Sequence, residues 1–235
     1  MPGPIALVGA GEFQPAMADL DRELLAATGS PRPRVAIIPT ASMPDGEATF
    51  QHWASMGVEH FSALGAEVEA VLVRTRADAD DTGCAQAVGE ADLVYFSGGK
   101  PGYLLETIAG SALLAAALAA NDRGAVLAGC SAGAMVLAGR LVGFRRTILP
   151  WPIRWRPALG VVAGAAVLPH YDAFPETIAA AMALRVPRGI VVLGIDEDTA
   201  AVGRNGAWQV HGRARVTVWR GRHRERHRSG EIFGF

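Results

Sequence analysis

The sequence predicts an α/β protein in which a mainly parallel sheet carries helices on both faces, giving three layers. Short apolar runs typical of buried strands alternate along the chain with longer segments that have helical spacing. Strands joined by helices run parallel, and a parallel sheet is buried on both faces. Of the 235 residues, 50% are hydrophobic and 19% are charged, which is enough for one sizeable core. We therefore predict a single domain over residues 1–235, with a short antiparallel extension at its C-terminal end.

The predicted elements follow from these apolar runs and from the turn residues that end them. Strands are expected at residues 5–8, 35–38, 68–73, 93–96, 125–128, 161–168 and 190–195. Helices are expected at residues 16–27, 47–64, 103–120 and 177–184, and a further buried helix is expected to start at residue 135. The charged segment 74–81 is expected to be a surface loop. The extension is expected to contain strands at 200–203, 208–210 and 216–219, followed by a basic, solvated hairpin turn at 220–228.

The composition argues against several classes of protein. The formal net charge of −1 is not that of a general nucleic-acid-binding protein. Cys84 and Cys130 are too few for a disulfide framework or a metal-ligand cluster, so no metal site is expected. The N-terminal residues lack the basic region of a signal peptide, and no apolar run is long enough to span a bilayer. We therefore expect a cytoplasmic protein without a membrane partner.

The most informative segment is Gly129-Cys130-Ser131-Ala132-Gly133, between a predicted buried strand and a predicted helix. A serine with one glycine two residues before it and another two residues after it, on a strand-to-helix turn, is typical of a nucleophile elbow. Side chains at the glycine positions would collide with the strand and the helix. Ser131 then lies at a helix N-terminus, where free N–H groups favour developing negative charge. The alternative is a glycine-rich turn with an incidental serine.

Glycines also follow two other predicted strands, at the edge where open α/β sheets bind ligands. The N–H group of Gly99, in the Gly98-Gly99 turn, could join that of Ala132 to form an oxyanion hole, although a plain turn is equally compatible. Gly9-Ala10-Gly11 lacks the third glycine of a dinucleotide-binding motif, so we expect no such cofactor.

Ser131, His170 and Glu197 each follow a predicted strand of what should be one sheet, so we expect all three at the same edge of that sheet. Catalysis by serine, histidine and an acid needs a hydroxyl, a base that takes its proton and a carboxylate that orients the base. Asp172 is close to His170 in sequence, but its short side chain would have to turn back along its own strand exit. We therefore favour Glu197 as the acid, with Asp172 second. The other carboxylates near strand ends are Glu12 and Asp196.

Residues 140–157 are rich in arginine and tryptophan, and no acidic residue occurs from Arg123 through Tyr171. One interpretation is a substrate wall in which an arginine binds a carboxylate. The other is a hairpin whose arginines are solvated and stack on tryptophans. The residues concerned are Arg145, Arg146, Trp151, Arg154, Trp155 and Arg156.

Four segments together resemble the serine peptidase family of dipeptidase E and cyanophycinase: residues 95–99, 129–134, 168–170 and 194–200. The resemblance covers nearly the whole chain. It implies a class I glutamine-amidotransferase-like, flavodoxin-like α/β fold and hydrolysis of peptide bonds through an acyl-serine without metal. It also implies that Ser131 is the nucleophile, that His170 is the base, and that Gly99 and Ala132 form the oxyanion hole. Glu197 matches the acid of the cyanophycinase branch.

Two departures from the family pattern bear on the substrate. In the dipeptidase E branch the acid is an aspartate soon after the serine, where this chain has Arg145 and Arg146. Cyanophycinases have an arginine-rich segment around the histidine, where this chain has Pro169 before it and Tyr171-Asp172 after it. We therefore expect small peptides, including acidic or isopeptide-linked ones, as substrates. The candidate substrate-binding residues are Gly98, Glu12, Arg146, Arg154, Arg156 and Asp172.

Two other functions fit the same residues. A binding or sensor protein could keep the fold without turnover. A glutamine-amidotransferase-like amidase would need a cysteine at the apex of the elbow, whereas Cys130 is one residue early and is expected to face away. The sequence leaves open whether the protein is a monomer or a homodimer.

Overall fold

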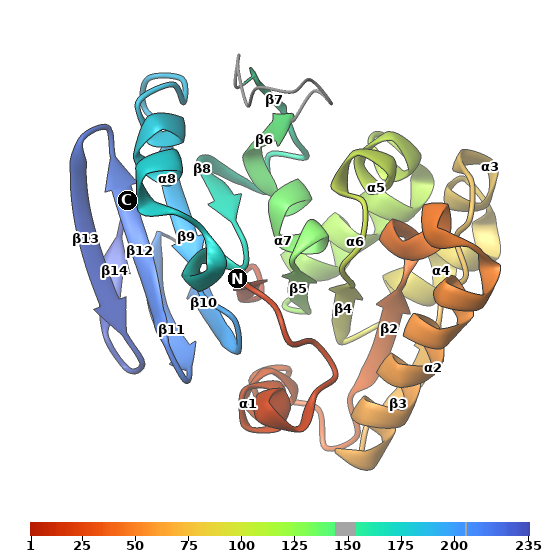
Figure 1. Ribbon diagram of the computed structural model, residues 1–235. Coiled ribbons are helices and arrows are strands. Elements are labelled where there is room, and N and C mark those ends of the chain that lie inside the picture. Colours follow the sequence, from red (N-terminus) through yellow and green to blue (C-terminus); the bar gives the residue numbers. More distant parts are fainter. Residues whose placement is uncertain (144–153, 205) are drawn as a thin grey trace.

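The computed structural model describes residues 1–143, 154–204 and 206–235, which form two sheets with helices around and between them (Figure 1). The larger sheet has eight strands in the order β14-β11-β10-β1-β5-β4-β2-β3. Its parallel part consists of β1 (Ile5–Val8), β2 (Arg34–Ile38), β3 (Glu67–Ala70), β4 (Leu93–Phe96) and β5 (Val126–Cys130). Its antiparallel part consists of β10 (Thr199–Arg204), β11 (Ala207–Gly212) and β14 (Ile232–Gly234).

The second sheet has six strands in the order β13-β12-β9-β8-β6-β7. Its strands are β6 (Ala138–Gly143), β7 (Arg154–Pro157), β8 (Val162–Leu168), β9 (Val191–Ile195), β12 (Arg215–Arg220) and β13 (His223–Arg228). The central strands β6, β8 and β9 are parallel, and β7, β12 and β13 pair antiparallel to their neighbours. The expectation that the strands before Ser131, His170 and Glu197 belong to one sheet is therefore wrong. An apolar run reveals a buried strand, but it does not reveal which of two sheets the strand joins.

Alternating side chains of the larger sheet form two cores. Ala6 and Val8 of β1 face helices α1 (Ala18–Ala27) and α2 (Glu47–Ala63), whereas Leu7 faces the opposite side. On that opposite side lie α4 (Thr82–Gly89), α5 (Pro101–Ile108), α6 (Ala112–Asp122) and α7 (Ala132–Leu137). This period of two is the signature of a sheet covered on both faces, and it agrees with the predicted fold class.

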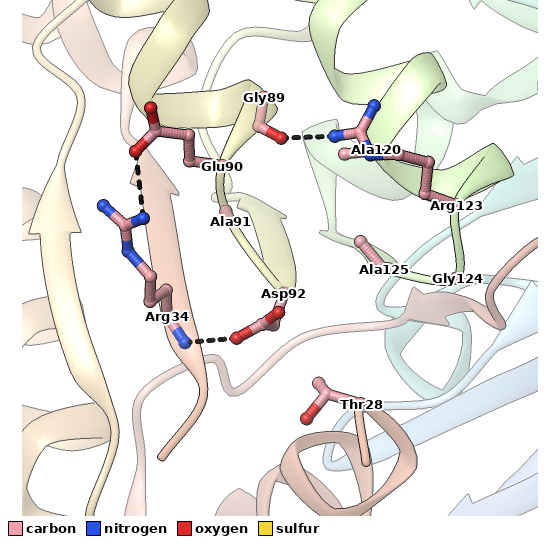
Figure 2. A pocket seen from close by; sticks show the side chains of 10 residues that line it. All are labelled: Thr28, Arg34, Gly89, Glu90, Ala91, Asp92, Ala120, Arg123, Gly124 and Ala125. Atoms are coloured by element: carbon pink, nitrogen blue, oxygen red, sulfur yellow. Dashed lines mark hydrogen bonds and ion pairs between the residues drawn. The ribbon is translucent and has the colours of Figure 1, made fainter. Parts of the chain in front are cut away.

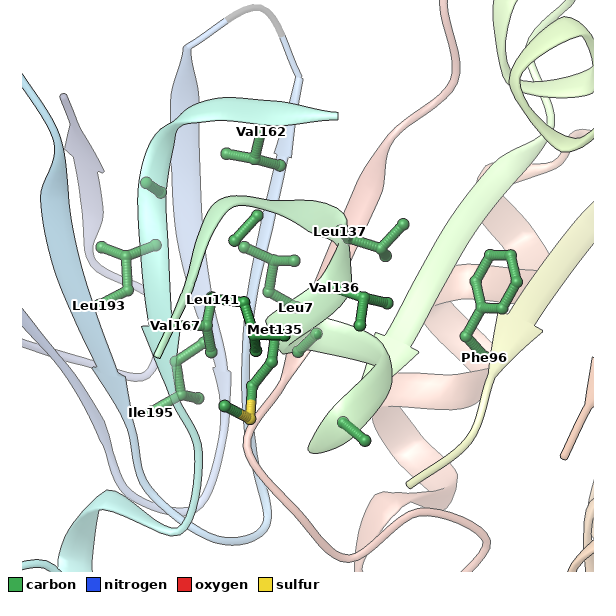
Figure 3. Close-up of a cluster of buried hydrophobic side chains, with 14 of the residues drawn as sticks. Leu7, Phe96, Met135, Val136, Leu137, Leu141, Val162, Val167, Leu193 and Ile195 are labelled. Atoms are coloured by element: carbon green, nitrogen blue, oxygen red, sulfur yellow. The ribbon is translucent and has the colours of Figure 1, made fainter. Parts of the chain in front are cut away.

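Helix α7 lies between the two sheets and is buried along its whole length. Figure 3 shows Val136 and Leu137 near Phe96 of the larger sheet, while Met135 lies near Ile195 of the second sheet. A helix that is apolar on all sides belongs in a core. The second sheet is therefore packed against the first through the helix that follows Ser131.

Several segments differ from the predicted elements. The helix expected to start at residue 135 spans Ala132–Leu137 and gives way to strand β6, and the strand expected at 68–73 ends at Ala70. The helix expected at 103–120 is divided into α5 and α6, because Gly110 has a positive φ of 68° and Ser111 caps α6 by accepting from the N–H of Leu114. The loop expected at 74–81 contains helix α3 (Arg76–Ala79), which starts with a capping box formed by Thr75 and Asp78. The basic turn expected at 220–228 continues as strand β13.

The remaining short elements are the 3₁₀ helices η1 (Pro15–Met17), η2 (Thr40–Asp45) and η3 (Tyr171–Ala173), and helix α8 (Glu176–Ala183). Among the described helices, none alone has the length and apolar character needed to cross a membrane. Helices α5 and α6 reach that length only as a pair, which is bent by 90°.

Candidate active site

Ser131 occupies a strained turn between β5 and α7. Its φ of 48° and ψ of −105° lie outside the regions that L-residues prefer. The flanking glycines are required by contact: a Cβ on Gly129 would lie 2.5 Å from the carbonyl carbon of Gly133, and a Cβ on Gly133 would lie 2.2 Å from the carbonyl oxygen of Phe96. The Ala132 N–H group lies in the first turn of α7 and therefore has no acceptor within the helix. The turn has the geometry that the elbow motif predicts.

His170 and Glu197 reach Ser131 from the second sheet. Oγ of Ser131 lies 3.1 Å from Nε2 of His170, and Nδ1 of His170 lies 2.7 Å from Oε1 of Glu197. A carboxylate only accepts hydrogen bonds, so Nδ1 carries the proton and Nε2 is left to accept from the serine hydroxyl. His170 follows β8 and has a left-handed backbone with φ 51° and ψ 39°. Glu197 lies two residues after the end of β9.

The other acidic residues near strand ends have different partners. Oδ1 of Asp172 accepts a hydrogen bond of 2.9 Å from the backbone N–H of Glu197, so Asp172 contacts Glu197 rather than the histidine. Asp196 is buried, and its Oδ2 lies 3.2 Å from Nε of Arg215. Burial raises the pKa of the Asp196 carboxyl. Of the four candidate carboxylates, Glu197 is the one that the structure bonds to His170.

The Gly98-Gly99 turn follows β4 and packs against η2. Gly99 has a φ of 139°, and a Cβ there would lie 2.3 Å from the carbonyl oxygen of Ala41. The next residue, Lys100, donates its N–H group to the same oxygen at 2.7 Å. Gly98 donates its N–H group at 2.7 Å to Oε1 of Glu12, so that donor is not free for a substrate. The part of η2 that supports Gly99 was missed from sequence, although it follows β2, a neighbour of β4.

Glu12 lies beneath the elbow rather than on the exposed edge of the site. It is 5% exposed, and its Oε2 accepts a 2.8 Å hydrogen bond from the Cys130 thiol. Burial, together with the Glu12 carboxylate, raises the pKa of the Cys130 thiol well above its usual range. The sulfur therefore keeps its proton, which it donates to Glu12.

The arginine-rich segment forms a hairpin of β6 and β7 in the part that the structure describes. Nη1 of Arg156 lies 3.2 Å from Oε1 of Glu106 on α5, so this arginine has an acidic partner that is distant in sequence. Its guanidinium also lies against Gly102, where an added Cβ would be 2.9 Å from Nη2. Arg154 is exposed on β7. Arg145, Arg146 and Trp151 lie outside the described residues.

A polar hollow of about 370 Å³ lies at the opposite edge of the larger sheet (Figure 2). Arg34 starts β2, and Asp92 and Ala125 directly precede β4 and β5, so the hollow is at the amino ends of the strands. Its charged side chains are engaged within the protein: Arg34 pairs with Glu90 at 2.9 Å, Arg123 donates to the carbonyl oxygen of Gly89, and Asp92 accepts from the backbone N–H of Arg34. The hollow is thus separate from Ser131, which follows the carboxyl end of β5.

Among the described residues, no group of three or more histidine, cysteine, aspartate or glutamate side chains is placed to hold a metal ion.

Comparisons with known proteins identify the family of the chain and proteins that share its fold. The family model described as peptidase family S51 matches residues 5–210. The crystal structure of a peptidase from an acI-B1 Actinobacterium superposes with a TM-score of 0.89 at 33% sequence identity, and the match covers 100% of this chain and 98% of that chain. A putative peptidase E protein from Listeria monocytogenes EGD-e has a TM-score of 0.66 at 18% identity, covering 91% of this chain and 100% of that one, which shows a shared fold. No curated protein matches the chain.

Proposed function

Since the chain belongs to peptidase family S51 and is a serine-type peptidase, we propose that Ser131 is its nucleophile, with His170 as the general base and Glu197 as the orienting acid. The observation that carries this proposal is the continuous path from Ser131 Oγ to His170 Nε2 at 3.1 Å and from His170 Nδ1 to Glu197 Oε1 at 2.7 Å. Both distances are within hydrogen-bond reach, which is the geometry that a nucleophile, its base and an orienting carboxylate need.

The reaction proceeds in two halves. Ser131 Oγ attacks the carbonyl carbon of the peptide bond while His170 Nε2 takes its proton, and Glu197 stabilises the imidazolium that forms. The imidazolium then protonates the leaving amine, which departs as the acyl-serine forms. In the second half His170 takes a proton from water, the hydroxide attacks the acyl carbon, and Ser131 recovers its proton as the acid product leaves.

The N–H groups of Gly99 and Ala132 bind the oxyanion of each tetrahedral intermediate. The N–H group of Ala132 has no acceptor within α7, and that of Gly98 is already engaged by Glu12. Gly99 is therefore the donor available on the β4 side of the serine. Such preorganised donors act where charge develops in the transition state.

The substrates are small peptides with a free carboxylate, including acidic and isopeptide-linked ones. Arg156 supports this class because its guanidinium lies against Gly102, in the first turn of the helix that follows the Gly98-Gly99 turn. A substrate carboxylate would compete with Glu106 for that guanidinium. Arg154, Arg146 and Asp172 remain candidate substrate-binding residues.

The amidase alternative requires a reactive thiol at the apex of the turn. The Cys130 side chain is fully buried and donates to Glu12, and its raised pKa keeps it protonated. A thiolate is the nucleophilic form of cysteine. These contacts favour serine chemistry over cysteine chemistry.

The test is the reaction of the protein with a fluorophosphonate probe, followed by mass spectrometry of the labelled peptide. We expect the probe on Ser131 and no labelling of Ser131→Ala, with peptide turnover reduced by roughly 10⁴-fold or more in that variant. Cys130→Ser, which keeps a hydrogen-bond donor for Glu12, is the matched control and should still be labelled at Ser131. Near-native turnover by Ser131→Ala would contradict the proposal, and a stable fold without labelling or turnover would favour a binding or sensor protein.

A further inference from the structure

Glu12 is a buried carboxylate that the proposed chemistry does not use. It is 5% exposed and lies in the loop that follows β1. Removing a carboxylate from water is costly unless hydrogen bonds replace the lost hydration. Both of its oxygens are indeed bonded: one partner, Cys130, directly precedes the proposed nucleophile in the chain, and the other, Gly98, lies against it. The role of Glu12 therefore depends on which parts of the site its two hydrogen bonds hold together.

The two groups that bond to Glu12 lie at the carboxyl ends of two neighbouring strands. Oε1 accepts from the N–H of Gly98, two residues beyond β4, at 2.7 Å, and Oε2 accepts from the thiol of Cys130, the last residue of β5, at 2.8 Å. Strands β4 and β5 are directly paired, with Phe96 opposite Gly129. One side chain therefore joins the turn that carries Gly99 to the strand that carries Ser131.

The three groups are in close contact. A Cβ on Gly98 would lie 2.5 Å from Oε1 of Glu12 and 3.4 Å from the Cβ of Ser131. Gly98 is thus packed between the carboxylate and the serine, with no room for a side chain. The hydrogen bond from Gly98 to Glu12 holds the peptide group that enters the turn, and the hydrogen bond from Lys100 to the carbonyl oxygen of Ala41 holds the one that leaves it. The peptide group between them, which carries the N–H of Gly99, is thus held from both ends.

The loop that carries Glu12 is itself held in place. The next residue, Phe13, has a φ of 64°, which is uncommon for a residue with a side chain. Its ring is 5.2 Å from that of Tyr95 and 6.2 Å from that of Phe61, between centroids. Packing of this kind over-determines a strained backbone, and such strain is concentrated at functional sites.

We propose that Glu12 is a positioning residue that presets the oxyanion hole by fixing the Gly98-Gly99 turn against the end of β5. The inference rests on the proposed function of Ser131, because it assigns Glu12 a task only in stabilising the intermediate formed there. Glu12 does not touch the substrate; it acts through the backbone of Gly98 and Gly99. This differs from the substrate-binding role expected from its place after the first strand.

The test compares Glu12→Ala and Glu12→Gln with Asp21→Asn. Asp21 is another buried acidic residue of the N-terminal region, bonded at 2.8 Å to His60 rather than to the site, so it controls for loss of a buried carboxylate. We expect kcat of Glu12→Ala to fall by roughly 100-fold, as for loss of one oxyanion-hole donor, with KM changed less than about twofold. Glu12→Gln keeps an oxygen for Gly98 but loses the acceptor for Cys130, so its decrease should be smaller. Asp21→Asn should keep kcat even if its melting temperature falls.

A second readout separates positioning from general stability. The affinity for a peptide boronic acid, which forms a tetrahedral adduct with serine, should fall in parallel with kcat, whereas product affinity should not. If Glu12→Ala does not fold, the same comparison is made with Glu12→Gln and Cys130→Ala. If fluorophosphonate labels the wild-type protein and the Glu12 variants are as active as wild type, the positioning role alone is overturned. Wild-type protein that is neither labelled nor active would overturn the proposed function, and the positioning role with it.

Discussion

Ser131 and the backbone around it belong to the eight-stranded sheet, whereas His170 and Glu197 follow strands of the six-stranded sheet. The nucleophile side, made of Glu12, the Gly98-Gly99 turn and residues 130–132, is largely buried: Cys130 is 0% exposed and Ala132 is 1% exposed. The base side, made of His170, Asp172 and Glu197, is open, with the His170 side chain 47% exposed and that of Glu197 53% exposed.

This difference separates two ways of holding a catalytic group. The nucleophile side is fixed by backbone contacts that leave no space for a Cβ and by a buried carboxylate. The base side is fixed by hydrogen bonds near solvent, where a charge can form on the imidazole without a large loss of hydration. In the mechanism we propose, preorganisation is thus concentrated where the oxyanion develops, and solvent access where the proton moves.

The largest effect that tests this comparison is expected at the acid. Glu197→Gln should lower kcat by roughly 10²–10⁴-fold, because the histidine loses the carboxylate that fixes its tautomer and stabilises its charge. Asp172→Asn is the matched control on the same side: Asp172 contacts the backbone N–H of Glu197, so its loss should cost less than about tenfold. Steady-state kinetics on one peptide substrate measure both. The reverse order of effects would make Asp172 the acid.

A smaller effect is expected at Arg156, a candidate substrate-binding residue. Arg156→Gln should raise KM about tenfold for peptides with a free carboxylate and leave KM for the amidated peptides unchanged, since a charged hydrogen bond is lost. Glu106→Gln releases the guanidinium from its partner and should keep or increase the preference for free carboxylates. Identical preferences in wild type and both variants would return Arg156 to a purely structural role.

The smallest effect concerns Asp21, a buried carboxyl outside the nucleophile side, and is read from stability. Burial raises the pKa of the Asp21 carboxyl, and the hydrogen bond from His60 only partly offsets this. The folded protein thus binds the Asp21 proton more readily than the unfolded chain, whose aspartates have a pKa of about 3.9. The resulting stabilisation is complete below that value and is lost as pH rises through the folded-state pKa.

Asparagine does not titrate, so the stability of wild type relative to Asp21→Asn should decrease as pH is raised from about 4 towards neutral. Urea unfolding of both proteins at a series of pH values measures the difference, and pH effects common to both cancel. A difference that stays constant over this range would show that Asp21 has the same pKa in both states.

The sequence predicted the parallel core well because its strands are short apolar runs that end in turn residues. Strands β1 and β4 have the predicted bounds, 5–8 and 93–96. It did not predict two sheets, since β8 and β9 are as apolar as strands of the larger sheet. The break at Gly110-Ser111 was missed because the apolar spacing continues across it, although serine is a common helix cap.

The candidate site, like the fold, was predicted from the sequence only in part. The structure brings Ser131, His170 and Glu197 into contact, as the motifs indicated, although the reason given, a shared sheet, is wrong; their roles stay predictions. The position of Glu12 could not be foreseen, because an acidic residue after a strand is usually placed at the exposed edge. Only the approach of Gly98 and Cys130 from two neighbouring strands shows where its oxygens point.

The order of the strands bears on how the protein is made. The chain leaves the larger sheet after β5, builds the centre of the second sheet, and then returns: β10 pairs with β1, and β12 pairs with β9. A nascent chain that ends at residue 198 therefore already contains the serine, the histidine and the glutamate, with both neighbours of β5 and of β8, but it lacks β12, the second neighbour of β9. Residues 199–234 then complete both sheets, since β10, β11 and β14 join the larger one and β12 and β13 join the second, so the framework around the three side chains closes only after all three have been made.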